Sequence, residues 1–358
     1  MSTTLPDDQR LEQISARAFE HPADRAATAA LQAIPMLDTV VRKLIEFGYE
    51  RALRQGFLAG SVRLGTEQLP EVWASHVAAF ARLDAGPPPD LYLTQFPLAN
   101  AAAIGASKPI VVVNSRTVEL LDALEQRTVL AHEAGHVLAE HVKYRTALMI
   151  LLRLGGATRL GFLAGLPLLG VQLALLEWYR AAELSSDRAA TLVNRDPLVT
   201  CRTLMVLAGG AASRKLNLDA FVRQAQEYED WDSGWDRLGR LRTELTLTHS
   251  YPVRRVHELM AWVQSGEYDR IAGGDYIRRG QEPGPREEAG DAVEFYAERF
   301  RKSFREAGES ISRVGSSLAG ASDKAGQTVA DASERFAEWL RGTPGREPRE
   351  PGDGDGAS

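Results

Sequence analysis

The sequence predicts an α+β fold that is mostly helical and includes a small antiparallel sheet. Three observations lead to this prediction. Apolar residues recur at spacings of three and four in most segments between residues 25 and 246. Pro87-Pro-Pro-Asp90 interrupts this pattern, and two short apolar runs, 101–105 and 108–113, follow it as strands. An apolar content of 44% in 358 residues suits one large globular domain with an appendage.

The helices are placed by their apolar spacing and by the residues that end them. Asp196-Pro197 ends the helix that carries Glu183, and Gly209-Gly210 ends the helix after it. Further helices are predicted at 25–62, 71–83, 216–229 and 235–246.

Residues 132–136 read His-Glu-Ala-Gly-His and are the strongest functional signal in the chain. The preceding segment, Ser115–Leu130, has helical periodicity, and Asp122 with Glu125 forms a D-x-x-E capping pattern within it. Two histidines four residues apart on a helix project from one face, so both imidazoles can reach one metal ion. Glu133 then lies where it can take a proton from water that this metal activates.

A catalytic zinc site needs a third protein ligand, and Glu183 is the candidate. Asp187 lies four residues later on the same predicted helix face, where it can accept a hydrogen bond from a ligating histidine. The alternative is that these two acids form an ordinary solvated face. Two histidines and a glutamate favour one Zn2+ per chain over other divalent ions.

Beyond this segment, the chain resembles the HtpX-like and CAAX prenyl protease-like zinc endopeptidases, which are gluzincins. Residues Phe96–Gly105 and Lys108–Val113 are similar to that family's P-x-x-N-A-F-A-x-G and P-x-I-V-V strand pair, with Ala102 in place of an aromatic residue. Residues Thr248–Pro252 and Arg255 are similar to its T-H-P-x-x-x-x-R element, with the proline two residues late.

The resemblance covers about residues 20–265 and implies a role for each matching residue. Zinc would be bound by His132, His136 and Glu183. Glu133 would be the general base, and Asp187 would orient His132.

The resemblance also implies residues that handle the substrate. His249 would stabilise the oxyanion that forms from the peptide carbonyl, and Arg255 would brace this region through a carboxylate. A strand at the sheet edge would pair with the substrate backbone with little selectivity for side chains. Its residues are Ala102, Ala103, Ile104 and Gly105.

The predicted function is hydrolysis of extended or unfolded polypeptides by a zinc metalloendopeptidase, in protein quality control at a membrane surface. The alternative is a catalytically silent zinc-binding scaffold or chaperone-like module that docks through its C-terminal helix. The intact Glu133 argues against a silent site, because such a site has no need of a base. Prenyl-peptide processing is a third possibility, but it usually requires a transmembrane chamber that this sequence lacks.

Composition restricts partners and location. A net charge of −6, with basic residues scattered among acids, gives no basis for nucleic-acid binding. Cys201 is the only cysteine, so no intrachain disulfide forms. Residues 1–8 lack the basic and apolar parts of a signal peptide, and we therefore expect a cytoplasmic protein. The sequence does not indicate the oligomeric state.

Residues 160–176 are apolar apart from Gln172 and approach the length of a membrane span. A single span would place His136 and Glu183 on opposite sides of the bilayer, although both must reach one zinc ion. The segment is therefore either buried against the catalytic helices or dipped into a membrane surface.

The predicted organisation is a peptidase domain at 1–280, a linker at 281–291, an amphipathic helical tail at 292–341 and disorder at 342–358. Four basic residues flank the aromatic start of the tail's apolar stripe, a pattern compatible with peripheral contact with an anionic membrane. They are Arg299, Arg301, Lys302 and Arg305. The alternative is that the tail packs on the peptidase domain or on a second tail.

Overall fold

The computed structural model describes residues 10–32, 49–95, 99–105, 108–157, 166–230 and 251–282, and shows the predicted α+β fold. The α-helices within these ranges are α1 (Pro22–Gln32), α3 (Tyr49–Gly60), α4 (Pro70–Arg82), α5 (Ser115–Leu120), α6 (Ala123–Leu138), α7 (Val142–Ala157), α8 (Leu166–Asn194), α9 (Pro197–Gly209), α10 (Leu218–Asp230), α12 (Pro252–Gln264) and α13 (Glu267–Ala272). The short 3-10 helices are η2 (Ala16–Ala18) and η3 (Gly210–Lys215). The strands are β1 (Val62–Arg63), β2 (Leu91–Thr94), β3 (Ala101–Ile104) and β4 (Ile110–Asn114).

The sheet is mixed, so the prediction of an antiparallel sheet is wrong for one pair of strands. The strand order is β1-β2-β4-β3. β3 pairs antiparallel with β4, with Ala103 opposite Val111, but β2 and β4 are parallel. The chain reverses twice between β2 and β4, and β4 then inserts between β2 and β3. The sequences of strands this short do not indicate the strand order, because the order depends on which strands pair in the folded sheet.

The capping box before the histidine helix is present, but the predicted helix from Ser115 is interrupted. Leu121 is extended, and the Asp122 carboxylate accepts hydrogen bonds from the backbone N–H groups of Leu124 and Glu125. The Glu125 side chain in turn accepts a bond from the Asp122 N–H at 2.9 Å. These bonds satisfy the first donors of a new helix, so α5 ends and α6 begins here.

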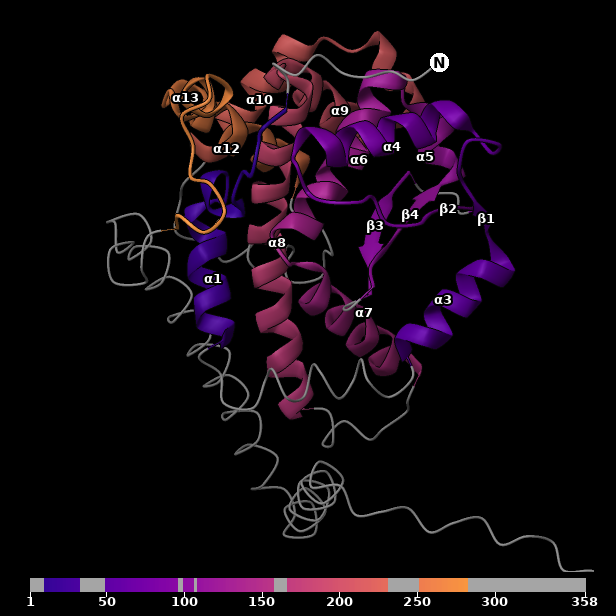
Figure 1. Ribbon diagram of the computed structural model, residues 1–358. Coiled ribbons are helices and arrows are strands. Elements are labelled where there is room, and N and C mark those ends of the chain that lie inside the picture. The colour runs from indigo at the N-terminus through magenta and orange to yellow at the C-terminus, as the bar shows by residue number, and fades with distance from the viewer. Residues whose placement is uncertain are drawn as a thin grey trace, which may run out of the picture.

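Helix α8 runs through the length of the molecule, with α1 along one side and α7 and the sheet on the other (Figure 1). Its first turns take in residues 166–176 of the apolar segment, where Leu175 and Leu176 are buried. In the part of the chain that the structure describes, no helix is both long and apolar enough to cross a membrane. The predicted helix at 235–246 and the predicted tail lie outside the described residues.

Helices α6 and α8 pack closely at Gly135, and this contact positions the site. A Cβ atom on Gly135 would lie 2.7 Å from the Ala189 Cβ and 3.3 Å from the Ser186 Cα. The small residues Ala131 and Ala134 of α6 and Ala189 and Ala190 of α8 belong to the same hydrophobic core cluster. The small residues of the His-Glu-Ala-Gly-His segment therefore set the distance between the two helices.

We expect Gly135→Ala to destabilise the fold by about 1–3 kcal/mol, because the added methyl group overpacks the contact. This loss should appear although alanine favours a helix over glycine by about 1 kcal/mol. Urea unfolding of the metal-free protein measures it. Gly56→Ala in α3 is the control, since no atom lies within 4 Å of a Cβ there. An equal or higher stability for Gly135→Ala than for the control contradicts the packing argument.

Candidate metal centre

Three buried side chains from two helices converge on one point. His132 and His136 on α6 have their Nε2 atoms 3.1 Å apart. The Oε1 atom of Glu183 on α8 lies 3.2 Å from the Nε2 of His136 and 3.6 Å from that of His132. Among the described residues, this is the group of three whose ligand atoms all lie close enough to share an ion, within 4.8 Å of one another.

The donor set fits a zinc ion. Ligand atoms about 2.0–2.2 Å from a tetrahedral zinc lie roughly 3.3–3.6 Å from each other. The separations of 3.1, 3.2 and 3.6 Å lie near this range. Two imidazole nitrogens and one carboxylate oxygen are also the ligand types of catalytic zinc sites. All three ligands are buried, with exposed fractions of 8% for His132 and 0% for His136 and Glu183.

Asp187 and Arg255 hold the ligands from behind. The Asp187 Oδ1 atom lies 3.0 Å from the His132 Nδ1, the ring nitrogen that faces away from the other ligands. Arg255 on α12 donates to both oxygens of Asp187, at 2.6 and 2.7 Å. Its third nitrogen lies 3.1 Å from the Glu183 Oε2. One guanidinium therefore fixes both carboxylates, which share a helix face four residues apart.

The charges of the two histidines differ. Burial disfavours the cationic form of His132, but the carboxylates of Glu183 and Asp187 outweigh it and raise its pKa to about 9. At His136 burial dominates and holds the pKa well below its ordinary value. Burial also opposes ionisation of Asp187, but Arg255 outweighs it and keeps the pKa of that carboxyl below its usual range. The metal-free site thus holds one imidazolium and one neutral imidazole at neutral pH.

Glu133 lies between the metal ligands and the sheet. Its Oε2 atom accepts hydrogen bonds from the Ala103 backbone N–H and from the Arg145 guanidinium, both at 2.6 Å. Arg145 comes from α7, and its guanidinium also lies 5.2 Å from the centre of the Tyr179 ring. The carboxylate that the sequence predicts as the base is thus buried, paired with a cation and adjacent to strand β3.

Tyr179 and Arg145 also contact this site, and the sequence analysis did not identify them. Tyr179 stacks on the His136 ring at 5.9 Å between centroids, and its hydroxyl is hydrogen-bonded to Glu183. Its position four residues before Glu183 on one helix was a usable signal. Arg145 had no such signal, because it approaches Glu133 from a different helix.

Of the residues predicted to handle the substrate, the structure describes the strand but not His249. Ala102, Ala103 and Ile104 lie in β3, with Gly105 directly after it, and β3 is an edge strand within the described sheet. His249 lies outside the described residues.

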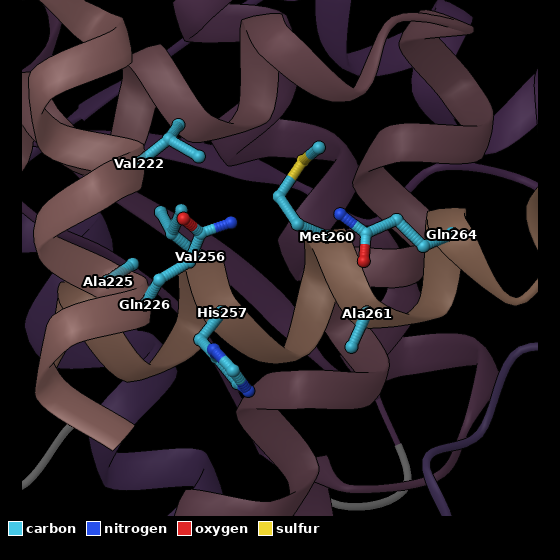
Figure 2. A pocket seen from close by; sticks show the side chains of 8 residues that line it. All are labelled: Val222, Ala225, Gln226, Val256, His257, Met260, Ala261 and Gln264. Carbon is cyan, nitrogen blue, oxygen red and sulfur yellow. The ribbon is translucent and has the colours of Figure 1, made fainter. Parts of the chain in front are cut away.

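A small pocket between α10 and α12 is separate from this centre (Figure 2). It is lined by Val222, Ala225, Gln226, Val256, His257, Met260, Ala261 and Gln264. It contains no carboxylate and none of the three ligands, so it is not the catalytic site.

Fold and site together are those of a metallopeptidase. The pattern of Peptidase family M48 matches residues 65–263, and the chain belongs to this family. A similar protein is the plastoglobule-localized metallopeptidase 48, chloroplastic, of Arabidopsis thaliana, which is 37% identical over 275 residues covering 73% of this chain and 76% of the relative. No solved structure gives a significant match. The predicted family is thereby confirmed, and the protein is a protease that acts on polypeptides.

We expect zinc to bind more tightly as the pH rises, until about pH 9. The pKa of His132 is raised, so below that pH a proton occupies the nitrogen and competes with the metal, by roughly tenfold per pH unit. Calorimetry in two buffers of different ionisation enthalpy should detect about one proton released per zinc near neutral pH. Asp187→Asn removes a charge that raises the pKa of His132, and should therefore weaken the pH dependence of zinc affinity near neutral pH. An affinity that does not change with pH contradicts this protonation state.

Proposed function

We propose that this metallopeptidase is a zinc-dependent endopeptidase that hydrolyses extended or unfolded polypeptides. The observation that supports it is the convergence of His132, His136 and Glu183 beside a paired, buried Glu133 at the edge of the sheet. A zinc ion held by the three ligands would supply a Lewis acid to water and to the scissile carbonyl.

Glu133 would transfer the proton in both halves of the reaction. It would take the proton from the attacking water and deliver it to the leaving amine. In the substrate-free chain its hydrogen bond to the Ala103 N–H holds the carboxylate next to β3, and a substrate strand that pairs with β3 would release this bond. Arg145 on α7 donates to the same carboxylate and keeps it oriented. The role of His249 in stabilising the oxyanion stays a prediction from the resemblance.

The outer edge of β3 supports binding of an extended chain. β3 pairs with β4 on one side, and its other edge faces α6 and α7. There the Ala103 N–H donates to Glu133, the Gly105 N–H and C=O bond to Thr146 at 2.9 and 2.8 Å, and the Ala101 C=O accepts from Arg145 at 3.3 Å. A substrate strand would exchange the neutral Thr146 bonds for backbone bonds of similar strength, whereas the charge-assisted bonds from Ala103 to Glu133 and from Arg145 to Ala101 would cost more to replace.

We expect Glu133→Gln to reduce cleavage of an unfolded protein by about 10²–10⁴-fold, because the amide cannot accept the proton. Zinc content should stay at one ion per chain. The measurement is the rate of peptide-bond cleavage by the purified chain with added zinc, beside the metal content of both forms. The same substrate in its folded state should resist cleavage, since a folded chain offers no extended segment to β3.

Each other outcome has a distinct meaning. Equal activity in both forms would refute the role of Glu133. Zinc binding without cleavage in either form would refute the endopeptidase and favour the scaffold alternative. Cleavage of folded and unfolded substrate at equal rates would refute the requirement for an extended chain.

We further propose that this activity serves protein quality control at a membrane surface, with contact through the predicted tail at 292–341. The apolar stripe and the basic residues Arg299, Arg301, Lys302 and Arg305 support this location. The full chain should sediment with anionic vesicles and not with neutral ones. A variant with these four residues changed to glutamine is the control and should stay in solution. Equal sedimentation of both forms would refute the contact.

A further inference from the structure

Behind His136, two buried residues form a chain of hydrogen bonds that the catalytic chemistry does not use. The His136 Nδ1 lies 3.0 Å from the Nδ1 of His141. The other ring nitrogen of His141 lies 2.9 Å from the Asp24 Oδ2. The exposed fractions are 0% for His136, 3% for His141 and 1% for Asp24, so water does not compete for these bonds.

Metal binding leaves one consistent arrangement of protons along this chain. If the Nε2 of His136 binds a metal, its Nδ1 carries the hydrogen and donates it. The Nδ1 of His141 must then accept, and the hydrogen of His141 is on Nε2, where it donates to Asp24. The opposite arrangement would protonate the Nε2 of His136 and block the metal. In the metal-binding arrangement Asp24 accepts this hydrogen, so its carboxylate favours the tautomer of His141 that leaves the Nε2 of His136 free to bind.

The fold places both residues by particular local features. Helix α6 ends at Leu138, and Glu140 adopts a left-handed conformation with φ of 57°. This turn brings the His141 N–H to the backbone carbonyl of His136 at 2.9 Å and places the two rings 5.2 Å apart. The Trp178 ring packs nearly perpendicular to the His141 ring, with 5.6 Å between their centroids. His141 is thus held in one orientation.

Asp24 comes from α1, a helix that precedes the region matched by the family pattern. The Ser185 hydroxyl on α8 donates to its Oδ2 at 2.6 Å, and the Thr28 hydroxyl lies 3.3 Å from its Oδ1. Ser185 also accepts the His21 N–H at 2.9 Å, which fixes the start of α1 against α8. Asp24 is therefore bonded on both oxygens and aimed at His141.

We propose that Asp24 and His141 are positioning residues for the metal ligand His136, and that α1 is part of the metal centre. Each ligating imidazole is thus oriented by a carboxylate. Asp187 bonds directly to His132, and Asp24 acts on His136 through the imidazole of His141. The inference rests on the proposed zinc site and concerns its affinity, not the cleavage step.

The test measures the zinc affinity of the full chain by competition with a chelator, and the visible spectrum of the cobalt-substituted protein. His141→Phe keeps a ring but leaves the His136 N–H without an acceptor, and should weaken zinc binding roughly 10–100-fold. Asp24→Asn keeps the side-chain shape and should weaken it roughly tenfold. Both should alter the cobalt spectrum, which reports ligand geometry. His141→Gln retains one acceptor and one donor and should lie between wild type and His141→Phe.

His76→Phe is the matched control. His76 is also a fully buried histidine, but its ring bonds to the Pro89 carbonyl at 2.9 Å and not to a metal ligand. This variant should lose stability and keep its zinc affinity within roughly twofold, because no bond to a ligand changes.

The outcomes separate this inference from the proposed function. Wild-type affinity and spectrum in Asp24→Asn and His141→Phe would overturn it, as would equal losses in all variants including His76→Phe. Should His141→Phe not fold, Asp24→Asn and His141→Gln decide. Zinc binding without cleavage in the wild type would refute only the endopeptidase, and a wild type that binds no zinc would refute the metal site on which both depend.

Discussion

The metal site depends above all on the close approach of α6 and α8. The first helix carries two ligands and the second carries one, so the distance between them decides whether a single ion can reach all three. That distance is set by glycine and alanine at the contact, with room for no side chain at Gly135. Ligand separations of 3.1–3.6 Å follow from it. The segment thus supplies both the ligands and the packing that brings them together.

A second constraint is the compensation of buried charge. Glu133, Glu183 and Asp187 are buried carboxylates, and two guanidinium groups, from Arg145 and Arg255, lie against them. One negative charge is left over, and the imidazolium of His132 balances it in the metal-free chain. A divalent ion would replace that proton. Because an unpaired buried charge is costly, the site favours a cation at its centre in either state.

The same contacts link chemistry to substrate binding. Strand β3 is held at its outer edge by side chains of α6 and α7, and the general-base candidate is one of these side chains. Under the proposed function, a substrate that pairs with β3 would therefore lie beside Glu133. Support for the ligands comes from two further helices, since Arg255 lies on α12 and Asp24 on α1, and from Tyr179 on α8 itself. The centre is consequently built from most of the domain.

The sequence alone determined the residues whose geometry depends on one helix. A period of 3.6 residues per turn places His132 with His136, and Glu183 with Asp187, whatever surrounds them, and the capping box at Asp122 is likewise local. Only the tertiary structure decided which side chains meet across elements: Arg145 with Glu133, Arg255 with both acids of α8, and Asp24 with His141. The parallel pairing of β2 and β4 belongs to the same group. These contacts depend on how elements distant in the chain pack against each other, and no local periodicity encodes that.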